Sequence, residues 1–344
     1  MNLFPGTTAD EVWRKAYTAL TGGDSLSKFQ PSRSGDTLEL LHTVLEIDDP
    51  RQRWILSRKP AINPAFAIAE TLWILAGHND AAVLNYWFPR LPKFKGEGVV
   101  YSGAYGYRFR KHFRIDQIRR ACEVLSANPA SRQVVLQLWD SFTDFPNSDG
   151  APQGPDVPCN VLSLLKVRDG RLEWTQIMRS NDVLRGLPYN IVQFTVLQEV
   201  IAGWLGLEVG SYHHWSDSLH LYLSDRSNFS CGEEPKVELN TDSLAIDCTL
   251  GDALIADLYR RMVELSMSEV SESQLAGLIS LPDVPIGYQN LFRVLGAESA
   301  RRNGRHEQAQ VIMESCANPQ LLQVWSAWWA RTLSGRKGPR NAAP

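Results

Sequence analysis

The stretch Val157-Pro158-Cys159-Asn160-Val161 lies between two segments that favour strands, and the interpretation of the whole chain depends on it. An apolar run from Arg132 to Trp139 precedes it, and two further apolar runs follow between Asn160 and Met178. The dipeptide Asp169-Gly170 separates these two runs, and Asp-Gly favours a tight turn, so residues 160–178 predict a β-hairpin. A lone cysteine is usually a small buried hydrophobe. Cys159 therefore acquires a chemical role only through its neighbours.

Length and composition predict a folded protein with a full hydrophobic core. The 344 residues suffice for one large or two ordinary domains, and 44% of them are hydrophobic. The formal net charge of -3 argues against a nucleic-acid coat and a polybasic membrane anchor, so we expect neither kind of partner. No apolar run approaches the length of a bilayer crossing, and the first residues lack the pattern of a signal peptide. The sequence therefore predicts neither a membrane span nor export.

Five cysteines are scattered along the chain: Cys122, Cys159, Cys231, Cys248 and Cys316. Their number is odd and no two form a Cys-x-x-Cys pair, so the sequence predicts neither a disulfide framework nor a zinc site. A reducing, cytoplasmic location fits this pattern best. The adjacent His213 and His214 would point to opposite faces of a strand, so we expect no shared metal there either.

The first part of the chain contains one conspicuous acid in an apolar helix. A helix is predicted near residues 9–20, and a turn-rich loop with Arg33 leads into a predicted strand at 37–45. The run from Ala65 to Ala76 is apolar almost all round and predicts a buried helix, with Glu70 in its middle. A carboxylate in such a place needs a partner or a raised pKa, so Glu70 indicates a site. A capping role for Glu70 is the alternative.

The remaining segments alternate between loops, helices and one strand. Residues 88–104 are rich in Pro, Gly, Lys and Arg and predict an exposed loop. A largely apolar helix at 191–205 should pack centrally with Asn190 at its mouth, and residues 212–222 favour a strand. Further helices are expected at 115–125, 251–267, 271–279 and 321–333. We interpret the tryptophans of the last segment as a packing surface rather than a cofactor site.

A series of motifs in this order resembles the thymidylate synthase family. The most specific is Arg-Ser-x-Asp-x-x-x-Gly-x-Pro-Tyr-Asn, which runs from Arg179 to Asn190 with Pro158-Cys159 upstream. The other motifs are Arg33 in its loop, Glu70-x-x-Trp73, Tyr105 to Arg110, Ser131-Arg132 and His220-Leu221-Tyr222. Each short motif is weak by itself, and the resemblance depends on their shared order along the chain.

The resemblance implies an α/β fold (α+β) in which helices cover a large mixed sheet. Residues 31–230 would form the catalytic core, residues 1–30 an N-terminal helix, and residues 231–344 a helical extension packed on the same domain. The sheet would carry the interface of a homodimer.

The resemblance also implies a reaction, the folate-dependent transfer of a one-carbon unit to C5 of a pyrimidine nucleotide. The first expectation is conversion of dUMP to dTMP with 5,10-methylenetetrahydrofolate as cosubstrate and no metal. Cys159 would add as a thiolate to C6, which turns C5 into a carbon nucleophile. A free thiol is mostly protonated at neutral pH, so the charge of Arg179 and the phosphate site would favour the thiolate. Glu70 and Tyr105 would organise water for proton transfers.

The family's phosphate site is shared between two subunits. By resemblance, Arg33, Arg179 and Ser180 would bind the nucleotide phosphate within one subunit, and Arg132 would reach the site of the partner. Forked guanidinium donors suit a phosphate well. A second arginine of the family that reaches across is replaced by Gln133, which should weaken phosphate binding.

The remaining roles concern the base, the sugar and the folate. The Asn190 amide offers a donor and an acceptor, and so would read the O4 and N3-H edge of uracil, whereas an aspartate would fit cytosine better. The sugar hydroxyl would bind to His220 and Tyr222. The resemblance implies that the folate contacts are Glu70, Trp87, Asp182 and Gly186, with Asp182 and Asn190 also serving catalysis.

Three departures from the family pattern leave the reaction open. Asn160 replaces the usual histidine after the cysteine, one residue is added before His220, and helices replace a short apolar tail that would close over the folate. A closed, dry site favours hydride transfer and a methyl product, whereas water would give a hydroxymethyl product. The alternatives are therefore a uridylate or cytidylate 5-hydroxymethylase, and a nucleotide-binding homologue without turnover.

Overall fold

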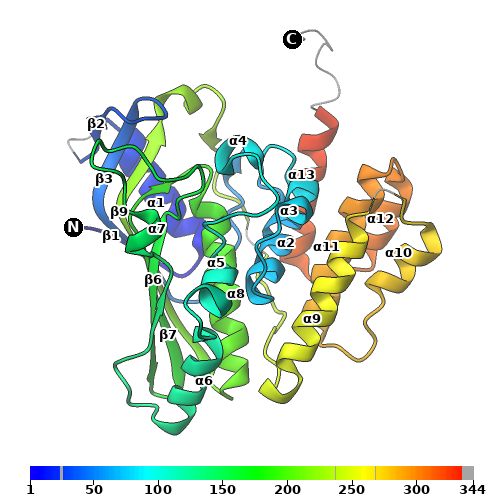
Figure 1. Ribbon diagram of the computed structural model, residues 1–344. Helices are drawn as coiled ribbons and strands as arrows, with labels where there is room; N and C mark the ends of the chain where they lie inside the picture. The colour runs from blue at the N-terminus through cyan, green and yellow to red at the C-terminus, as the bar shows by residue number, and fades with distance from the viewer. Residues whose placement is uncertain (24–25, 237, 268, 335–344) are drawn as a thin grey trace.

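A mixed β-sheet lies at the centre of the computed structural model, which describes residues 1–23, 26–236, 238–267 and 269–334 (Figure 1). Within the described residues the sheet has the strand order β1-β3-β9-β7-β6-β5, with β2 beside β3 and β8 beside β9. These strands are β1 (Asn2–Gly6), β2 (Lys28–Gln30), β3 (Thr37–Ile47), β5 (Val135–Gln137), β6 (Asn160–Arg168), β7 (Arg171–Met178), β8 (Asn181–Asp182) and β9 (Glu208–Tyr222). A separate antiparallel pair joins β4 (Arg58–Lys59) to β10 (Ser230–Cys231). The predicted α/β fold with a large mixed sheet is confirmed.

The predicted hairpin is confirmed as the antiparallel pair β6 and β7. Asp169 and Gly170 connect the two strands with φ values of 49° and 73°, the left-handed conformation that a tight two-residue turn requires. β7 pairs next with β9 in parallel, because a helix carries the chain back between these two strands. The hairpin thus extends from the middle of the sheet to its β5 edge.

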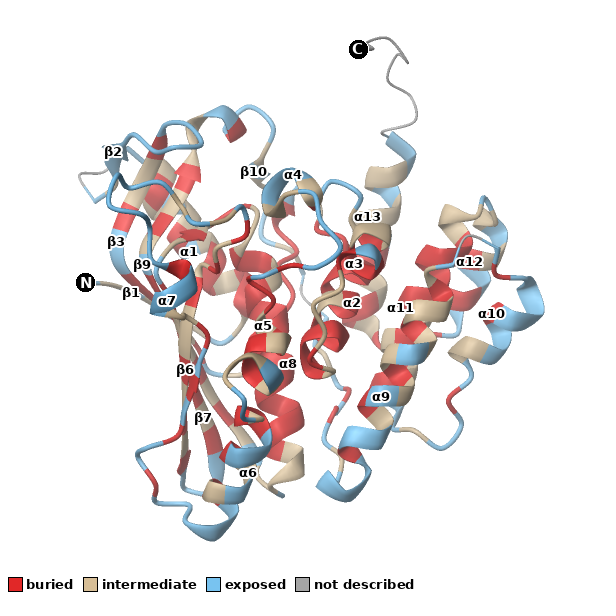
Figure 2. Cartoon of the chain, viewed as in Figure 1, coloured by how far each residue is buried: buried red, intermediate tan, exposed pale blue. Residues whose placement is uncertain are grey.

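Two helices that are apolar on nearly all sides fill the centre of the molecule. α8 (Leu187–Trp204) is the helix between β7 and β9 and contacts both strands, and α2 (Pro64–Leu75) packs on α8 (Figure 1). Figure 2 shows that most of both helices is buried. α2 begins at Asn63, whose side chain accepts from the Phe66 N–H. Glu70 is the half-buried exception on α2, as the sequence predicted.

Shorter helices complete the part of the chain before β6. They are α1 (Ala9–Thr21), α3 (Ala81–Trp87), α4 (Pro92–Lys95), α5 (Tyr105–Tyr107) with a π-helical turn at Arg108–His112, α6 (Gln117–Ala127) and α7 (Ser141–Asp144). The first 30 residues contain more than the expected helix, since β1 precedes α1 and pairs in parallel with β3. Trp13 of α1 donates to the Val183 carbonyl at 2.7 Å, which ties α1 to the segment before α8.

The C-terminal part is helical, as expected, and packs on α2 through α9, α11 and α13. Its helices are α9 (Cys248–Leu265), α10 (Glu272–Ile279), α11 (Ile286–Arg302), α12 (His306–Glu314) and α13 (Pro319–Ser334). The sequence did not predict α11, because buried polar residues such as Asn290 and Glu298 interrupt its apolar pattern. Glu298 is paired with Arg301 and Arg302 and accepts from the Trp328 indole, which supports a packing role for the tryptophans. The domain boundary at residue 230 stays a prediction.

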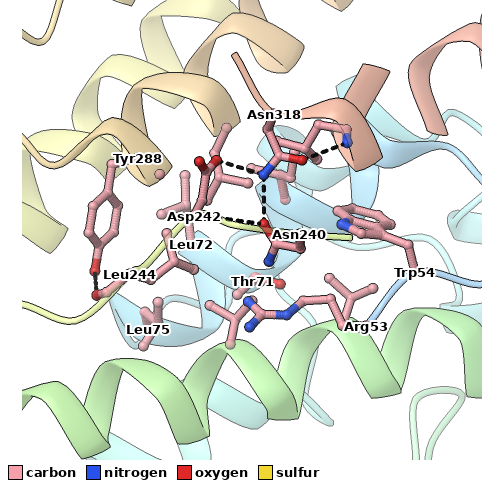
Figure 3. A pocket seen from close by; sticks show the side chains of 16 residues that line it. Arg53, Trp54, Thr71, Leu72, Leu75, Asn240, Asp242, Leu244, Tyr288 and Asn318 are labelled. Atoms are coloured by element: carbon pink, nitrogen blue, oxygen red, sulfur yellow. Dashed lines mark hydrogen bonds between the residues drawn. The ribbon is translucent and has the colours of Figure 1, made fainter. Parts of the chain in front are cut away.

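A buried polar network joins this helical part to the core around a pocket (Figure 3). Asn318 Nδ2 donates to Asn240 Oδ1 at 2.6 Å and to Asp242 Oδ2 at 2.7 Å, and the Tyr288 hydroxyl donates to the Leu244 carbonyl at 2.7 Å. Burial raises the pKa of Tyr288. Among the described residues that line this pocket, none is a site residue predicted from the sequence, so we interpret it as part of the packing between the two regions.

The adjacent histidines of β9 point to opposite faces, as predicted. His214 is fully buried between Tyr212 and Asn181, at 2.8 Å from each, and burial lowers its pKa to about 3. His213 lies on the other face, 3.8 Å from Glu46. No described helix is long and apolar enough to cross a membrane.

Candidate active site

The hairpin places Cys159 and Arg179 next to each other. Cys159 precedes β6 and Arg179 follows β7, so both lie at the open end of the hairpin. The Arg179 backbone N–H donates to the Cys159 carbonyl at 2.9 Å, and Arg179 Nε donates to the Pro158 carbonyl at 3.0 Å. The guanidinium lies over the Trp139 ring, 5.4 Å from its centroid. A positive charge is thereby held on the loop that carries the half-buried Cys159.

An ion pair that the sequence did not indicate stabilises the loop before Cys159. Lys95 Nζ lies 2.9 Å from Asp156 Oδ1, and Asp156 Oδ2 accepts from the Gly103 N–H at 2.7 Å. Burial lowers the pKa of Lys95, but the charge of Asp156 and its hydrogen bond outweigh that effect, so the pKa is raised. The charges of Glu70 and Cys159 act in the same direction. The predicted exposed loop at 88–104 is wrong in part, because Pro92–Lys95 form α4 and Leu91, Tyr101 and Ala104 are buried.

Tyr105 lies within reach of the same charges. Burial raises its pKa well above the usual range, and the negative charges of Cys159 and Glu70 raise it further. Its ring stacks on Phe194 of α8, with 5.9 Å between the centroids. Tyr105 is thus a protonated hydroxyl group close to two of the predicted catalytic residues.

Two hydrogen bonds link Glu70 to Asn190 through Gln193. Gln193 Nε2 donates to Glu70 Oε2 at 2.5 Å, and Asn190 Nδ2 donates to Gln193 Oε1 at 3.0 Å. Burial raises the pKa of Glu70 to about 7, although the charge of Lys95 and the bond from Gln193 oppose this. Glu70 therefore has both the partner and the raised pKa that its position predicted. The sequence analysis missed Gln193, and its signal was a polar side chain one turn after Asn190 in an apolar helix.

Asp182 and His220 face each other across the pairing of β8 with β9. Asp182 Oδ1 accepts from the Leu184 and Arg185 N–H groups at 2.8 and 2.9 Å, while the buried Oδ2 has no hydrogen-bond partner among the described residues and lies 3.9 Å from Arg185 Nε. Burial raises the pKa of Asp182 and lowers that of His220. The Ser180 hydroxyl lies 3.5 Å from His220 Nδ1. His220, Ser180 and Asp182, which were predicted to bind the sugar, the phosphate and the folate, therefore lie close together.

The predicted phosphate residue Arg33 is carried by a loop that lies beside Tyr222. The Leu223 N–H donates to the Asp36 carbonyl at 2.9 Å, which fixes the end of the loop to the end of β9. Arg185, which the sequence analysis did not single out, lies over the Tyr222 ring at 5.6 Å and pairs with Asp225 at 2.7 Å. The loop of Arg33 therefore lies beside the end of β9, where Arg185 contacts Tyr222.

Gly186 has a steric reason to be glycine. A Cβ at this position would lie 2.9 Å from Asn181 Oδ1 and 3.4 Å from Asn190 Oδ1. The first distance is shorter than ordinary contact, so any side chain would displace the amides around it. Gly186 thus allows the Asn181 and Asn190 amide oxygens to approach the start of α8 closely.

Trp87, a predicted folate contact, and Asn160, which departs from the family pattern, both lie in the interior. Trp87 is fully buried, and its indole Nε1 has no partner within the described part of the chain. Its contact with a folate stays a prediction. Asn160 is also fully buried and accepts from Gln176 Nε2, while its own Nδ2 is unpartnered in the same described part.

Arg132 lies apart from the other predicted residues. It is exposed next to β5, the edge strand of the sheet, and so is its neighbour Gln133. The structure therefore does not bring Arg132 into the cluster of the other predicted residues, and its role at the site of a second copy stays a prediction. Within the described ranges, no group of three or more His, Cys, Asp or Glu side chains is arranged to hold a metal ion.

Comparison with known proteins defines the class to which this sheet and site belong. A family model described as thymidylate synthase matches residues 27–252, which is more than half of the chain. The chain belongs to the thymidylate synthase family.

The relatives of the chain carry two different names. It is 35% identical over 237 residues to a deoxyuridylate hydroxymethyltransferase of Bacillus phage SP01, covering 65% of this chain and 60% of the relative. A deoxyuridylate hydroxymethyltransferase of Pseudomonas phage M6 is 35% identical over 175 residues, covering 50% and 48%. A thymidylate synthase of Bacillus licheniformis is 29% identical over 236 residues, covering 64% and 81%. The chain thus spans less than two thirds of the length of these two phage relatives.

Proposed function

We propose that the protein transfers a one-carbon unit from 5,10-methylenetetrahydrofolate to C5 of deoxyuridylate and releases 5-hydroxymethyldeoxyuridylate. The observation that carries the proposal is a site built from two groups of residues. The loop of Cys159 is held by the hydrogen bond from Arg179 and by the ion pair of Lys95 with Asp156. Hydrogen bonds through Gln193 link Glu70 to Asn190. One side supplies a nucleophile next to positive charge, and the other supplies an acid–base group and an amide for the base.

The proposed reaction begins at the thiolate of Cys159. Its sulfur adds to C6 of the uracil ring, and the electron pair of the C5–C6 bond moves toward O4. C5 then attacks the one-carbon unit that the folate supplies, loses its proton to water, and retains an exocyclic methylene after tetrahydrofolate leaves. Water adds to this methylene as its proton passes to the Glu70 carboxylate, and the Cys159 thiolate is expelled from C6. Glu70 suits this step because its pKa of about 7 lies near neutral pH.

The residues present fit a folate beside the nucleotide. Asp182 Oδ2 is a buried acceptor that has no hydrogen-bond partner among the described residues and lies 3.9 Å from Arg185 Nε. Such an acceptor is costly unless a hydrogen-bond donor reaches it. The N–H groups of a pterin ring are donors of this kind. This feature supports the predicted folate contact of Asp182, and the contact of Gly186 rests on the family resemblance.

A long match at 35% identity supports the hydroxymethyl product over the methyl product that the sequence suggested first. The chain is 35% identical over 237 residues to a protein named deoxyuridylate hydroxymethyltransferase, whereas proteins named thymidylate synthase match at 29% over 236 residues and at 36% over 183 residues. Thymidylate synthesis remains the second candidate because of these two matches. The name deoxyuridylate hydroxymethyltransferase specifies a uridylate, which the amide of Asn190 suits.

We also propose a homodimer, with a second copy of the chain on the sheet face opposite α8. Trp174 faces α8, where it packs against Phe194, so the alternate residues of the hairpin face the other way. Apolar side chains on that outer face are exposed or half-exposed: Val135, Leu162, Leu164, Ile177 and Trp215. Arg132 lies at the β5 edge of this face. A second copy would cover the apolar residues and receive Arg132 at its phosphate site.

The test is incubation of the purified protein with dUMP and methylenetetrahydrofolate, followed by dihydrofolate absorbance and nucleotide mass. A hydroxymethyl-sized gain without dihydrofolate is expected. A methyl-sized gain with dihydrofolate would establish thymidylate synthesis instead. Absence of product with both dUMP and dCMP would favour the non-catalytic alternative.

A further inference from the structure

Gln193 occupies the middle of a buried polar chain between the predicted base-reading residue and the predicted acid–base residue. It is 1% exposed, and Asn190 is 6% exposed. The two amides are one helical turn apart on α8 and thus lie on one face of that helix, while Glu70 comes from α2. The hydrogen bonds between them, at 2.5 and 3.0 Å, are therefore shielded from competing water.

The chemistry of the three groups fixes which end of each amide faces which neighbour. Gln193 presents its NH₂ group to Glu70 Oε2, and the ionised form of Glu70, which has no donor, requires this orientation. Its carbonyl oxygen consequently faces Asn190, and an acceptor in that place requires the Asn190 NH₂ group. The Asn190 carbonyl oxygen is thereby turned away from Gln193 and lies on the side of Gly186, 3.4 Å from where a Cβ of that residue would lie.

The orientation of an asparagine amide decides which pyrimidine it matches. Uracil offers a carbonyl acceptor at O4 next to an N3-H donor, and cytosine offers an amino donor at N4 next to an N3 acceptor. Rotation of the Asn190 amide by half a turn would exchange its donor and its acceptor. A free asparagine could therefore serve both bases, and discrimination needs a neighbour that prevents the rotation.

We infer that Gln193 is a positioning residue that, held by Glu70, locks the Asn190 amide in the orientation that accepts a uracil and rejects a cytosine. The inference rests on the proposed function, since it assumes that Asn190 faces the base of a pyrimidine nucleotide. Gln193 itself need not touch the nucleotide. Its role is to leave Asn190 with one donor and one acceptor in fixed places.

The test compares the binding of dUMP and dCMP by calorimetry, which does not require turnover. Gln193→Met keeps the volume of the side chain and removes both hydrogen bonds, and Gln193→Ser is a second variant that also frees the amide. Gln198→Met is the matched control, because Gln198 is a buried glutamine on the same helix that donates to the Leu172 and Gly210 carbonyls. The melting temperature of each variant reports whether it is folded.

The wild type is expected to bind dUMP at least about tenfold more tightly than dCMP, since a reversed amide leaves two mismatched groups. In both Gln193 variants this ratio should fall toward one, and in Gln198→Met it should persist. An unchanged ratio in folded Gln193 variants overturns the inference, as does a wild type that prefers dCMP. A wild type that binds neither nucleotide overturns the proposed function and the inference with it.

Discussion

Lys95 Nζ and Asp156 Oδ1 lie 2.9 Å apart and join α4 to the loop that precedes Cys159. Asp156 is buried, and the Lys95 side chain is about one fifth exposed, at 22%. The other carboxylate oxygen of Asp156 accepts from the Gly103 N–H, two residues before Tyr105. One ion pair therefore connects the loops that carry Cys159, the proposed nucleophile, and Tyr105.

Replacing Lys95 by methionine should loosen this connection. The variant Lys95→Met leaves the buried Asp156 without its cation, so we expect the free energy of unfolding to fall by about 1–3 kcal/mol. Urea denaturation at neutral pH measures the change. Lys93→Met is the matched control on the same short helix, because Lys93 is exposed and should tolerate the change within about 0.5 kcal/mol. Equal effects of the two substitutions would contradict the prediction.

Glu70 should make stability depend on pH. Its pKa rises from 4.5 to about 7 on folding, so the folded protein holds a proton that the unfolded chain has already released. The loss of folding stability caused by ionising the Glu70 carboxyl group is absent below about pH 4.5 and grows as the pH rises. It is complete above about pH 7, where it reaches roughly 3 kcal/mol. Glu70→Gln should therefore raise the free energy of unfolding more at pH 8 than at pH 5, as measured with urea.

Glu11 provides a control of opposite sign for this prediction. The hydrogen bond from Lys15 lowers the pKa of Glu11, so its carboxylate contributes stability that is lost as the pH falls. Glu11→Gln should reduce stability at pH 8 and have less effect at low pH. If Glu70→Gln changed the free energy of unfolding equally at both pH values, the raised pKa of Glu70 in the folded protein would be contradicted.

Cys159 should form a covalent adduct. The wild type, mixed with 5-fluoro-dUMP and methylenetetrahydrofolate, is expected to gain the mass of both compounds, because fluorine at C5 prevents completion of the reaction after the thiolate adds. Cys159→Ser should form no adduct and lose turnover by at least about 1,000-fold. Cys248→Ser, which changes an exposed cysteine, should behave as the wild type does. Noncovalent binding without an adduct in the wild type would argue against the enzymatic proposal.

Gly186→Ala should disturb the site without unfolding the protein. The added Cβ would lie 2.9 Å from Asn181 Oδ1, so that amide or the start of α8 must move. We expect kcat/KM to fall by about 10- to 100-fold, because small displacements of positioning groups are costly in catalysis. Gly154→Ala is the control, since a Cβ there meets no described atom within 4 Å. Full activity of Gly186→Ala would show that catalysis does not depend on the close approach of these amides to Gly186.

Complementation between two inactive variants tests the homodimer. Arg132→Ala keeps its own Cys159, and Cys159→Ser keeps its own Arg132. If Arg132 serves the partner's site, mixed dimers restore one intact site each, so activity should reappear when the two inactive proteins are mixed and allowed to exchange subunits. Mixing each variant with itself provides the control. Failure to recover activity, with exchange verified by a mass-labelled subunit, would contradict the proposal that Arg132 serves the partner's site.

Much of the fold could be predicted because local pattern and tertiary packing agree. The β6–β7 hairpin has alternating residues and an Asp-Gly turn, and α2 and α8 are apolar enough to be central in any arrangement. α11 was missed because its buried Asn290 and Glu298 look like surface residues in the sequence. Besides the local pairs of Glu298 with Arg301 and Arg302, these residues have partners in distant segments, namely Asp242 for Asn290 and Trp328 for Glu298, and no local pattern records the distant pairs.

The site was predictable to the extent that its residues fall in short motifs. Cys159, Arg179 and Asn190 belong to such motifs, and the structure brings the first two into direct contact through the backbone. Lys95 and Gln193 belong to none. Lys95 lies in a segment whose composition is typical of an exposed loop, and Gln193 resembles any polar residue in a helix, so their contribution appears only when separate elements meet.

α2 is enclosed by α8 on one side and by α9, α11 and α13 on the other, and 11 of its 12 residues are buried. This helix also carries Glu70. The family match ends at residue 252, near the start of α9, so an excised domain of residues 27–252 would expose to water much of the helix that carries Glu70. Grafting, truncation or exchange of this part of the chain must therefore carry the C-terminal helices along with it.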